Sequence, residues 1–239
     1  MNNKQIPAYL ILPPYLIGLV AGFFLILVST WADMEASVYG FPRQAHAGLK
    51  GFSCPVLMTR REVGRIAFTI SNTTDGKISP FIKFMASTPV LLEEHREDFD
   101  LAPGESRTLE WQVDADNIDL GQFIFAKVLV ISAYPLPTRE ASCGIFVLDL
   151  PIRGRETLWL LIAISLIGMG WGLYAMHVSR LATGARLAKY LPALAFLVIA
   201  VLLGFIFVFA GAWVQSTLVL AVILLLSVIL LVSFLMAPA

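Results

Sequence analysis

Four long apolar runs are separated by polar segments of very different length. The first run covers residues 9–31, and the other three cover residues 157–177, 191–210 and 214–236. A helix needs about 20 apolar residues to cross the hydrocarbon core of a bilayer. Each run is long enough, so the sequence predicts an α-helical transmembrane protein with four spans.

The first run contains Pro13 and Pro14, which a helix tolerates in its first turn but not in its interior. We therefore expect this helix to begin near Pro14. A cleaved signal peptide has a basic n-region and a short apolar region. Here only Lys4 precedes a long apolar run, so residues 1–31 are predicted to be a retained N-terminal anchor.

The charged residues are unevenly distributed along the chain. All seventeen acids and thirteen of the seventeen Lys and Arg lie between Asp33 and Glu156, so this segment carries a formal charge of −4 (13 − 17). The other basic residues are Lys4, Arg180, Arg186 and Lys189.

Short cytoplasmic loops are enriched in Lys and Arg, and the loop after the second apolar run contains three of these basic residues. This loop and both termini are therefore predicted to be cytoplasmic, which places residues 32–156 outside. With this orientation, Trp31, Trp159 and Trp213 fall near the outer interface, where aromatic residues are enriched.

The external segment alternates short β-like runs with turn signals. "TLEWQV" alternates apolar and polar residues, as a half-buried antiparallel strand does, and "IAFTI" is rich in β-branched and aromatic residues. Several short strands at this spacing are typical of a β-sandwich. The predicted strands cover residues 55–59, 65–71, 79–87, 107–113, 123–132 and 144–150.

Three stretches follow one another in a recognisable order: "IAFTISNTTDG", "FDLAPGESRTLEWQV" and "GQFIFAKVLVIS". Over roughly residues 54–150 this order resembles bacterial immunoglobulin-like modules of the CARDB type. The resemblance implies an Ig-like sandwich and a bacterial cytoplasmic membrane around the four helices. It implies no ligand residues, since such modules serve as spacers, adhesion units and assembly surfaces, and the fold does not determine the function.

The predicted organisation is an all-β Ig-like sandwich inserted between the first and second of four transmembrane helices. The parts are the anchor (1–31), an extended arm (32–53), the extracytoplasmic sandwich (54–152) and a region of three transmembrane helices (153–239).

The external segment contains both cysteines, Cys54 and Cys143. In an oxidising compartment two such cysteines suggest one disulfide. Two free buried thiols are the alternative. A metal site would need further His or Cys ligands, and none is close in sequence.

Motifs that carry chemistry are missing from the sequence. We find no P-loop, dinucleotide fingerprint, nucleophile elbow or zinc spacing. The spans contain no acid and no central Lys or Arg, which argues against an ion pathway. A formal net charge of zero argues against nucleic-acid binding. We therefore predict no enzymatic activity, no cofactor, no metal and no small-molecule ligand.

The three histidines do not form a site in the sequence. His46 lies in the arm, His177 lies at the cytoplasmic end of the second apolar run, and His95 lies in "EEHREDFD" (93–100). Clustered carboxylates can bind Ca²⁺, but this stretch lacks the EF-hand spacing. We interpret it as a solvated charged loop.

Small residues and the arm are the candidate contact sites. Gly18 and Gly22 make one G-x-x-x-G pattern and Gly168 and Gly172 another, a spacing that lets helices approach closely. The arm has no sandwich pattern, so it lies either on this sandwich or on another subunit, and we favour the second. The partner-contact candidates in the arm are Tyr39, Phe41, Pro42, His46 and Phe52.

Three functions remain open at this point. The first is a non-catalytic accessory or assembly subunit of a larger membrane complex, whose partners are other integral membrane subunits and the lipid bilayer. The second is a stand-alone surface protein that binds a glycan, a peptide or an envelope polymer through exposed aromatics such as Phe81, Phe84, Phe123 and Phe125. The third is a subunit that shares a redox or lipid site near His177 or His46.

Overall fold

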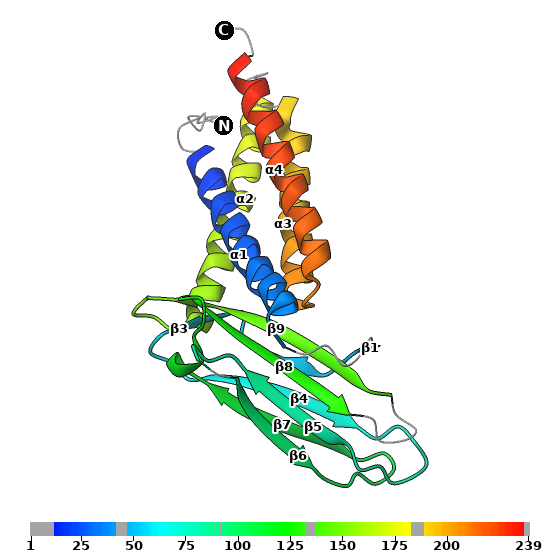
Figure 1. Cartoon of the computed structure of the whole chain (residues 1–239). Helices are drawn as coiled ribbons and strands as arrows, with labels where there is room; N and C mark the ends of the chain where they lie inside the picture. The colour runs from blue at the N-terminus through cyan, green and yellow to red at the C-terminus, as the bar shows by residue number, and fades with distance from the viewer. Residues whose placement is uncertain (1–11, 42–46, 91, 132–136, 183–188, 237–239) are drawn as a thin grey trace. The chain divides into compact units, whose positions relative to one another are not determined.

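The computed structural model describes residues 12–41, 47–90, 92–131, 137–182 and 189–236 (Figure 1). In chain order, helix α1 is followed by strands β1 to β9 and then by helices α2, α3 and α4. The chain divides into two compact units. We call Met1–Thr30 with Thr157–Ala239 the helical unit, and Trp31–Glu156 the strand unit.

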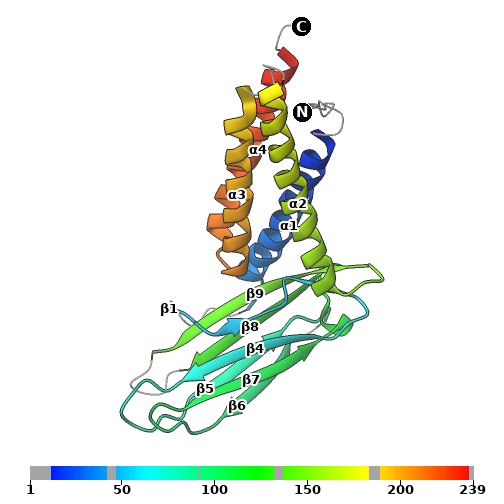
Figure 2. The ribbon, with the colours of Figure 1, turned by 180° about the vertical axis from the view of Figure 1, so that it is seen from behind.

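All four helices are long and apolar enough to cross a membrane, which confirms the four predicted apolar helices. In Figures 1 and 2 they run alongside one another. Their bounds are Leu12–Val38 for α1, Gly154–Ala182 for α2, Leu191–Phe209 for α3 and Trp213–Met236 for α4.

Helix α1 ends at Val38, beyond the predicted end of the anchor at Trp31. The sequence becomes polar there, but "WADMEASV" contains good helix formers such as Ala, Met and Glu. Trp31 Nε1 also donates a hydrogen bond of 3.0 Å to Glu35 Oε1, one turn along the helix. The start of the predicted extended arm is therefore helical.

The strand unit contains two β-sheets. The six-stranded sheet has the order β1-β9-β8-β5-β6, with β3 also paired to β9, and the three-stranded sheet has the order β2-β4-β7. The strands are β1 (Ala47–Gly48), β2 (Phe52–Ser53), β3 (Leu57–Thr59), β4 (Gly64–Ser71), β5 (Phe81–Ala86), β6 (Glu93–Asp98), β7 (Ser106–Val113), β8 (Phe123–Ile131) and β9 (Arg139–Leu148).

Facing side chains of the two sheets form one hydrophobic core. The alternation predicted for β7 is confirmed, because Leu109, Trp111 and Val113 are buried while the residues between them are exposed. The ring of Trp111 stacks on Phe84 of β5, with centroids 4.5 Å apart and an angle of 3° between the planes. Alternate residues of β4 face the same core.

Two turns close the pair formed by β4 and β7. Gly104 has φ +76°, which is the conformation that the third position of a type II turn requires, and Pro103 precedes it. Gly104 N donates to Asn72 O (2.9 Å) and Asn72 N donates to Glu105 O (2.8 Å). The "NTTDG" and "APGE" turns are therefore hydrogen-bonded to each other.

Strand β6 corrects the prediction of a charged loop over residues 93–100. Its residues Glu93–Asp98 pair antiparallel with β5 along its whole length. It lies at the edge of the sheet and is almost fully exposed, so no apolar face reveals it in the sequence. Charged side chains on an edge strand oppose pairing with other chains, and Lys83 Nζ of β5 lies 2.6 Å from Glu94 Oε2.

The predicted disulfide is confirmed. Cys54 and Cys143 are bonded across 89 residues of sequence. Cys54 directly follows β2 of the three-stranded sheet, and Cys143 lies in β9 of the six-stranded sheet. The bond therefore links the two sheets beside their common core.

We expect the double variant Cys54→Ser, Cys143→Ser to lower the free energy of unfolding of the strand unit by up to about 4–5 kcal/mol, because the unfolded chain regains the entropy of a long open loop. Pulse proteolysis of the full-length protein in increasing urea measures this loss. Reduction of the wild-type protein should reproduce it. Equal urea midpoints for the oxidised wild type and the variant would contradict the expectation.

Candidate functional site

The end of α1 lies against β8 and β9 within the strand unit. Gly144 of β9 has no side chain, and a Cβ atom there would overlap the carbonyl oxygen of Ala32. Gly144 N donates a hydrogen bond of 3.0 Å to Asp33 Oδ1, and the ring of Trp31 lies 5.2 Å from that of Phe123. The helix end thus covers the face of β8 and β9 that points away from the core.

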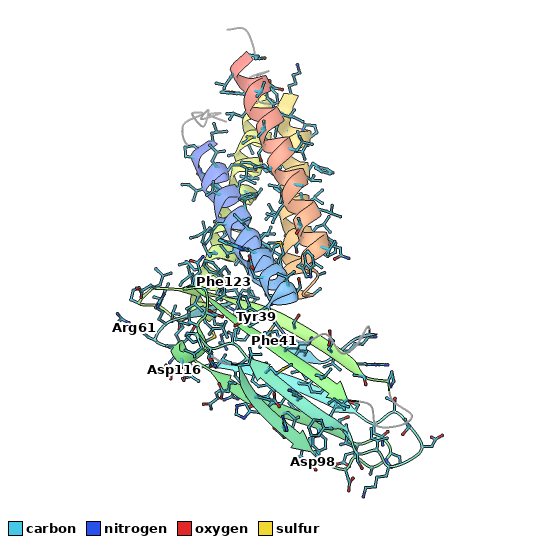
Figure 3. The ribbon with its side chains drawn as sticks, in the orientation of Figure 1. Tyr39, Phe41, Arg61, Asp98, Asp116 and Phe123 are labelled. Carbon is cyan, nitrogen blue, oxygen red and sulfur yellow. A yellow bond between two sulfur atoms is a disulfide. The ribbon has the colours of Figure 1, made fainter. Side chains whose placement is uncertain are left out.

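Two residues of the predicted partner-contact arm continue this cover (Figure 3). The ring of Tyr39 lies 4.4 Å from Phe125 and 4.9 Å from Phe41, and Phe41 is only 7% exposed. Tyr39 Oη donates a hydrogen bond to Asp119 Oδ2. Burial, and next the bond and charge of the Asp119 carboxylate, raise the pKa of Tyr39 to about 12.

A partner contact stays a prediction for Tyr39, Phe41 and Phe52, and the structure describes their contacts within this chain. Phe52 pairs with Phe68 in the three-stranded sheet and packs against the core. Tyr39 covers Phe125 on the face of β8 that points away from the core, whereas Phe52 lies on the core side. Pro42 and His46 lie outside the described residues.

The aromatic residues that would mark a surface-binding protein are mostly covered. Phe84 is 1% exposed, Phe123 3% and Phe125 0%. Phe81 is partly buried. The first packs in the core and the next two lie under the end of α1, so these four residues do not form an exposed aromatic cluster.

The start of α2 is also attached to the strands. Glu62 Oε1 accepts hydrogen bonds from Gly154 N (3.0 Å) and from Thr59 N (2.7 Å). A carboxylate at a helix N-terminus is favoured by the exposed N–H groups and by the helix dipole. Within the strand unit, a carboxylate hydrogen bond therefore fixes each helix end. Asp33 binds the end of α1 to β9, and Glu62 binds the start of α2.

The structure brings the two glycine motifs of the helical unit together. A Cβ atom at Gly18 of α1 would lie 2.7 Å from Met169 N of α2, and one at Gly168 would lie 2.5 Å from Pro14 O. Gly22 faces the hydroxyl of Ser165, and Gly172 faces Tyr15. These small-residue faces serve contacts within this chain, so they are covered rather than free for a partner helix.

We expect Gly168→Ala to destabilise the helical unit, because its Cβ would meet backbone atoms of α1. Gly170→Ala on the same helix is the matched control, since nothing lies within 4 Å of its Cβ and Ala is the better helix former by about 1 kcal/mol. Thermal unfolding of the detergent-solubilised protein, followed by circular dichroism, should give a lower midpoint for the first variant alone. Equal shifts in both variants would argue against the close α1–α2 contact.

Helix α4 is the least covered of the four helices. In its most apolar stretch only 6% of residues are buried inside the chain, against 39% for α1, 33% for α2 and 39% for α3. Its covered side includes Ser216, Leu220 and Ile223. The opposite side is formed by the exposed residues Leu218, Val222, Leu225 and Ile229, which we call the outer face of α4.

An apolar groove of about 280 Å³ lies between α1, α3 and α4. Among its lining residues are Leu16 and Leu19 of α1, Leu194 of α3, and Leu231 and Phe234 of α4. It contains almost no polar surface, so it fits an aliphatic chain.

The histidines and carboxylates do not form a catalytic or metal site in the described part of the chain. No group of three or more His, Cys, Asp or Glu there is placed to hold a metal ion. His95 Nε2 lies 2.8 Å from Glu93 Oε1 on the exposed strand β6, and His177 is exposed near the end of α2. Hydrogen bonds from Asn117 and next from His95 hold the pKa of Glu93 below its usual value.

No protein-family model matches the chain, and a search of curated proteins finds no match. Among solved structures, the CARDB domain of a Pyrococcus furiosus protein, described as a complex with di-metal ions, is 9% identical with a TM-score of 0.33. The match covers 45% of this chain and 98% of that domain.

Two matches to larger proteins have identities and TM-scores similar to those of the CARDB match. Bacteroides uniformis β-glucuronidase 2 is 12% identical with a TM-score of 0.31, over 40% of this chain and 12% of that one. An alkylpurine DNA glycosylase of Pseudomonas fluorescens is 11% identical with a TM-score of 0.33, over 52% and 36%. The chain therefore spans about 12% of the glucuronidase's length, and these likenesses carry nothing about function.

Proposed function

We propose that this protein is a non-catalytic accessory or assembly subunit of a larger membrane protein complex. The observation that carries the proposal is the outer face of α4. The most apolar stretch of this helix has the smallest buried share inside the chain of the four. The other three helices have a larger buried share, so α4 offers the largest uncovered apolar face to a partner helix.

The chemistry of the chain supports a bracing role rather than catalysis. All acids lie between Asp33 and Glu156, and no Lys or Arg lies in the centre of an apolar run. Transport and proton pathways use ionisable groups inside the membrane. In the described residues, Glu93 accepts a hydrogen bond from the side chain of Asn117, and Glu62 accepts one from the backbone N–H of Gly154, so both carboxylates have structural partners.

The strand unit would act outside the bacterial cytoplasmic membrane in this proposal. The basic residues Arg180, Arg186 and Lys189, at and after the end of α2, favour a cytoplasmic position for the connection to α3. The disulfide fits an oxidising compartment. The two sheets are linked by the Cys54–Cys143 disulfide, and the unit is hydrogen-bonded to the end of α1 and the start of α2. Such a module would brace or dock an external partner.

The partner is tested by photo-crosslinking in the native membrane. A benzoylphenylalanine residue placed at Leu225 on the outer face should give an adduct with another protein, because a partner helix would cover that face. The same residue at Leu220, which is 8% exposed and faces this chain, is the control and should give no protein adduct. Mass spectrometry of the adducts identifies what is bound.

Two results would overturn the accessory role. The first is that Leu225 and its neighbour on the same face, Ile229, both yield lipid adducts alone. The second is that the purified chain by itself turns over a substrate. If the proposal is right, deletion of the gene should weaken assembly of the complex, while the remaining chains keep their activity.

The orientation is tested by cysteine labelling in intact cells. A Cys in place of the exposed Asp75 should react with a membrane-impermeant maleimide, since the strand unit is proposed to lie outside. A Cys in place of Thr183, in the basic loop, should react only after the membrane is permeabilised. The reverse pattern of labelling would invert the proposed topology.

A further inference from the structure

The apolar groove of the helical unit is built from one end of three helices. Its lining comes from the first half of α1, the first half of α3 and the last part of α4. Leu197 at the α3 side is 1% exposed, whereas Leu16 is 47% and Leu231 59% exposed. The groove thus has a closed back on α3 and open walls on α1 and α4.

Two tyrosine hydroxyls hold these three helices around the groove. Tyr15 Oη of α1 donates a hydrogen bond of 2.8 Å to Leu194 O of α3. Tyr190 Oη, at the start of α3, donates one of 3.2 Å to Ser233 O of α4. Because both hydroxyls are used in this way, they bridge the helices and leave the groove surface to leucine and phenylalanine side chains.

A lysine directly precedes one of the residues that line the groove. Tyr190 lines the groove, and the exposed Lys189 immediately precedes it. The charged residues outside Asp33–Glu156 are all basic, namely Lys4, Arg180, Arg186 and Lys189. An apolar groove with a lysine next to its lining is complementary to an aliphatic chain that carries an anionic head.

We infer that this groove is a binding site for one acyl chain of an anionic phospholipid, with its phosphate on the Lys189 side. The acyl chain replaces contacts that Leu16, Leu194, Leu231 and Phe234 would otherwise make with bulk lipid. The ammonium group of Lys189 selects the anionic head, since a basic residue near a membrane surface attracts such lipids. All residues of this binding site belong to this chain, so lipid binding requires no partner subunit.

The test uses the purified full-length protein in detergent with equal amounts of phosphatidylglycerol and phosphatidylcholine, and counts the retained lipid by native mass spectrometry. The wild type should retain phosphatidylglycerol in preference by about fivefold, as expected for one Lys near a headgroup. Lys189→Gln should abolish most of that preference while lipid is still bound. Lys189→Arg should preserve it.

The groove itself is tested by a matched pair of substitutions on α4. Leu231→Trp places a large ring in the groove and should reduce retained lipid of both kinds several-fold. Leu225→Trp lies on the outer face of the same helix at a similar exposure, 62% against 59%, and should retain lipid like the wild type. Circular dichroism checks that both variants remain folded.

A third arm identifies the source of the acyl chain. If oleate displaces phosphatidylglycerol at equal concentration, the site holds an acyl anion and belongs to a free fatty acid. If it does not, the phospholipid assignment stands. Equal lipid retention by the two tryptophan variants, or an unchanged lipid preference in Lys189→Gln, would overturn the inference. So would a protein adduct from a photo-crosslinker at Leu231, which would place a partner helix in the groove.

Discussion

The contact between the end of α1 and strands β8 and β9 determines how the strand unit is built. Strand β8 is buried on both faces almost along its whole length. Ile124 and its alternate neighbours form the core, while Phe123 and Phe125 face the other way. Apolar strands of this kind need a cover on each side. Here Trp31 and Tyr39 provide it, and Gly144 permits the approach because it has no Cβ to strike Ala32.

The helical unit depends on small residues in the same way. Without side chains at Gly18 and Gly168, backbone atoms of α1 and α2 come into contact, and packing of this kind stabilises helices where the surrounding medium is itself apolar. These glycines serve internal packing, so they do not supply the free surface of the helical unit. The helix with the largest share of such surface is α4, whose bulky Leu, Val and Ile side chains are mostly exposed.

Local patterns account for much of the fold. The alternation in "TLEWQV" predicts the one-sided burial of β7. The apolar run "FIFAKVLVI", interrupted by Lys127 alone, is explained by the two-sided burial of β8. Strand β6 could not be predicted in this way, because "EEHRED" has no apolar face and its pairing with β5 is a property of the sheet edge. The packing position of Tyr39 and Phe41 depends on contact with Phe125, which is remote in the sequence.

The sequence by itself determined the four apolar helices, the confinement of all acids to one segment and the cysteine pair, because length, charge and compartment are local or compositional properties. The tertiary structure decided where the arm packs, that the glycine motifs are used inside this chain, and that α1, α3 and α4 leave a groove between them. Each of these three features depends on which residues remote in sequence come close together in space. The periodicity of apolar residues along the chain does not determine that.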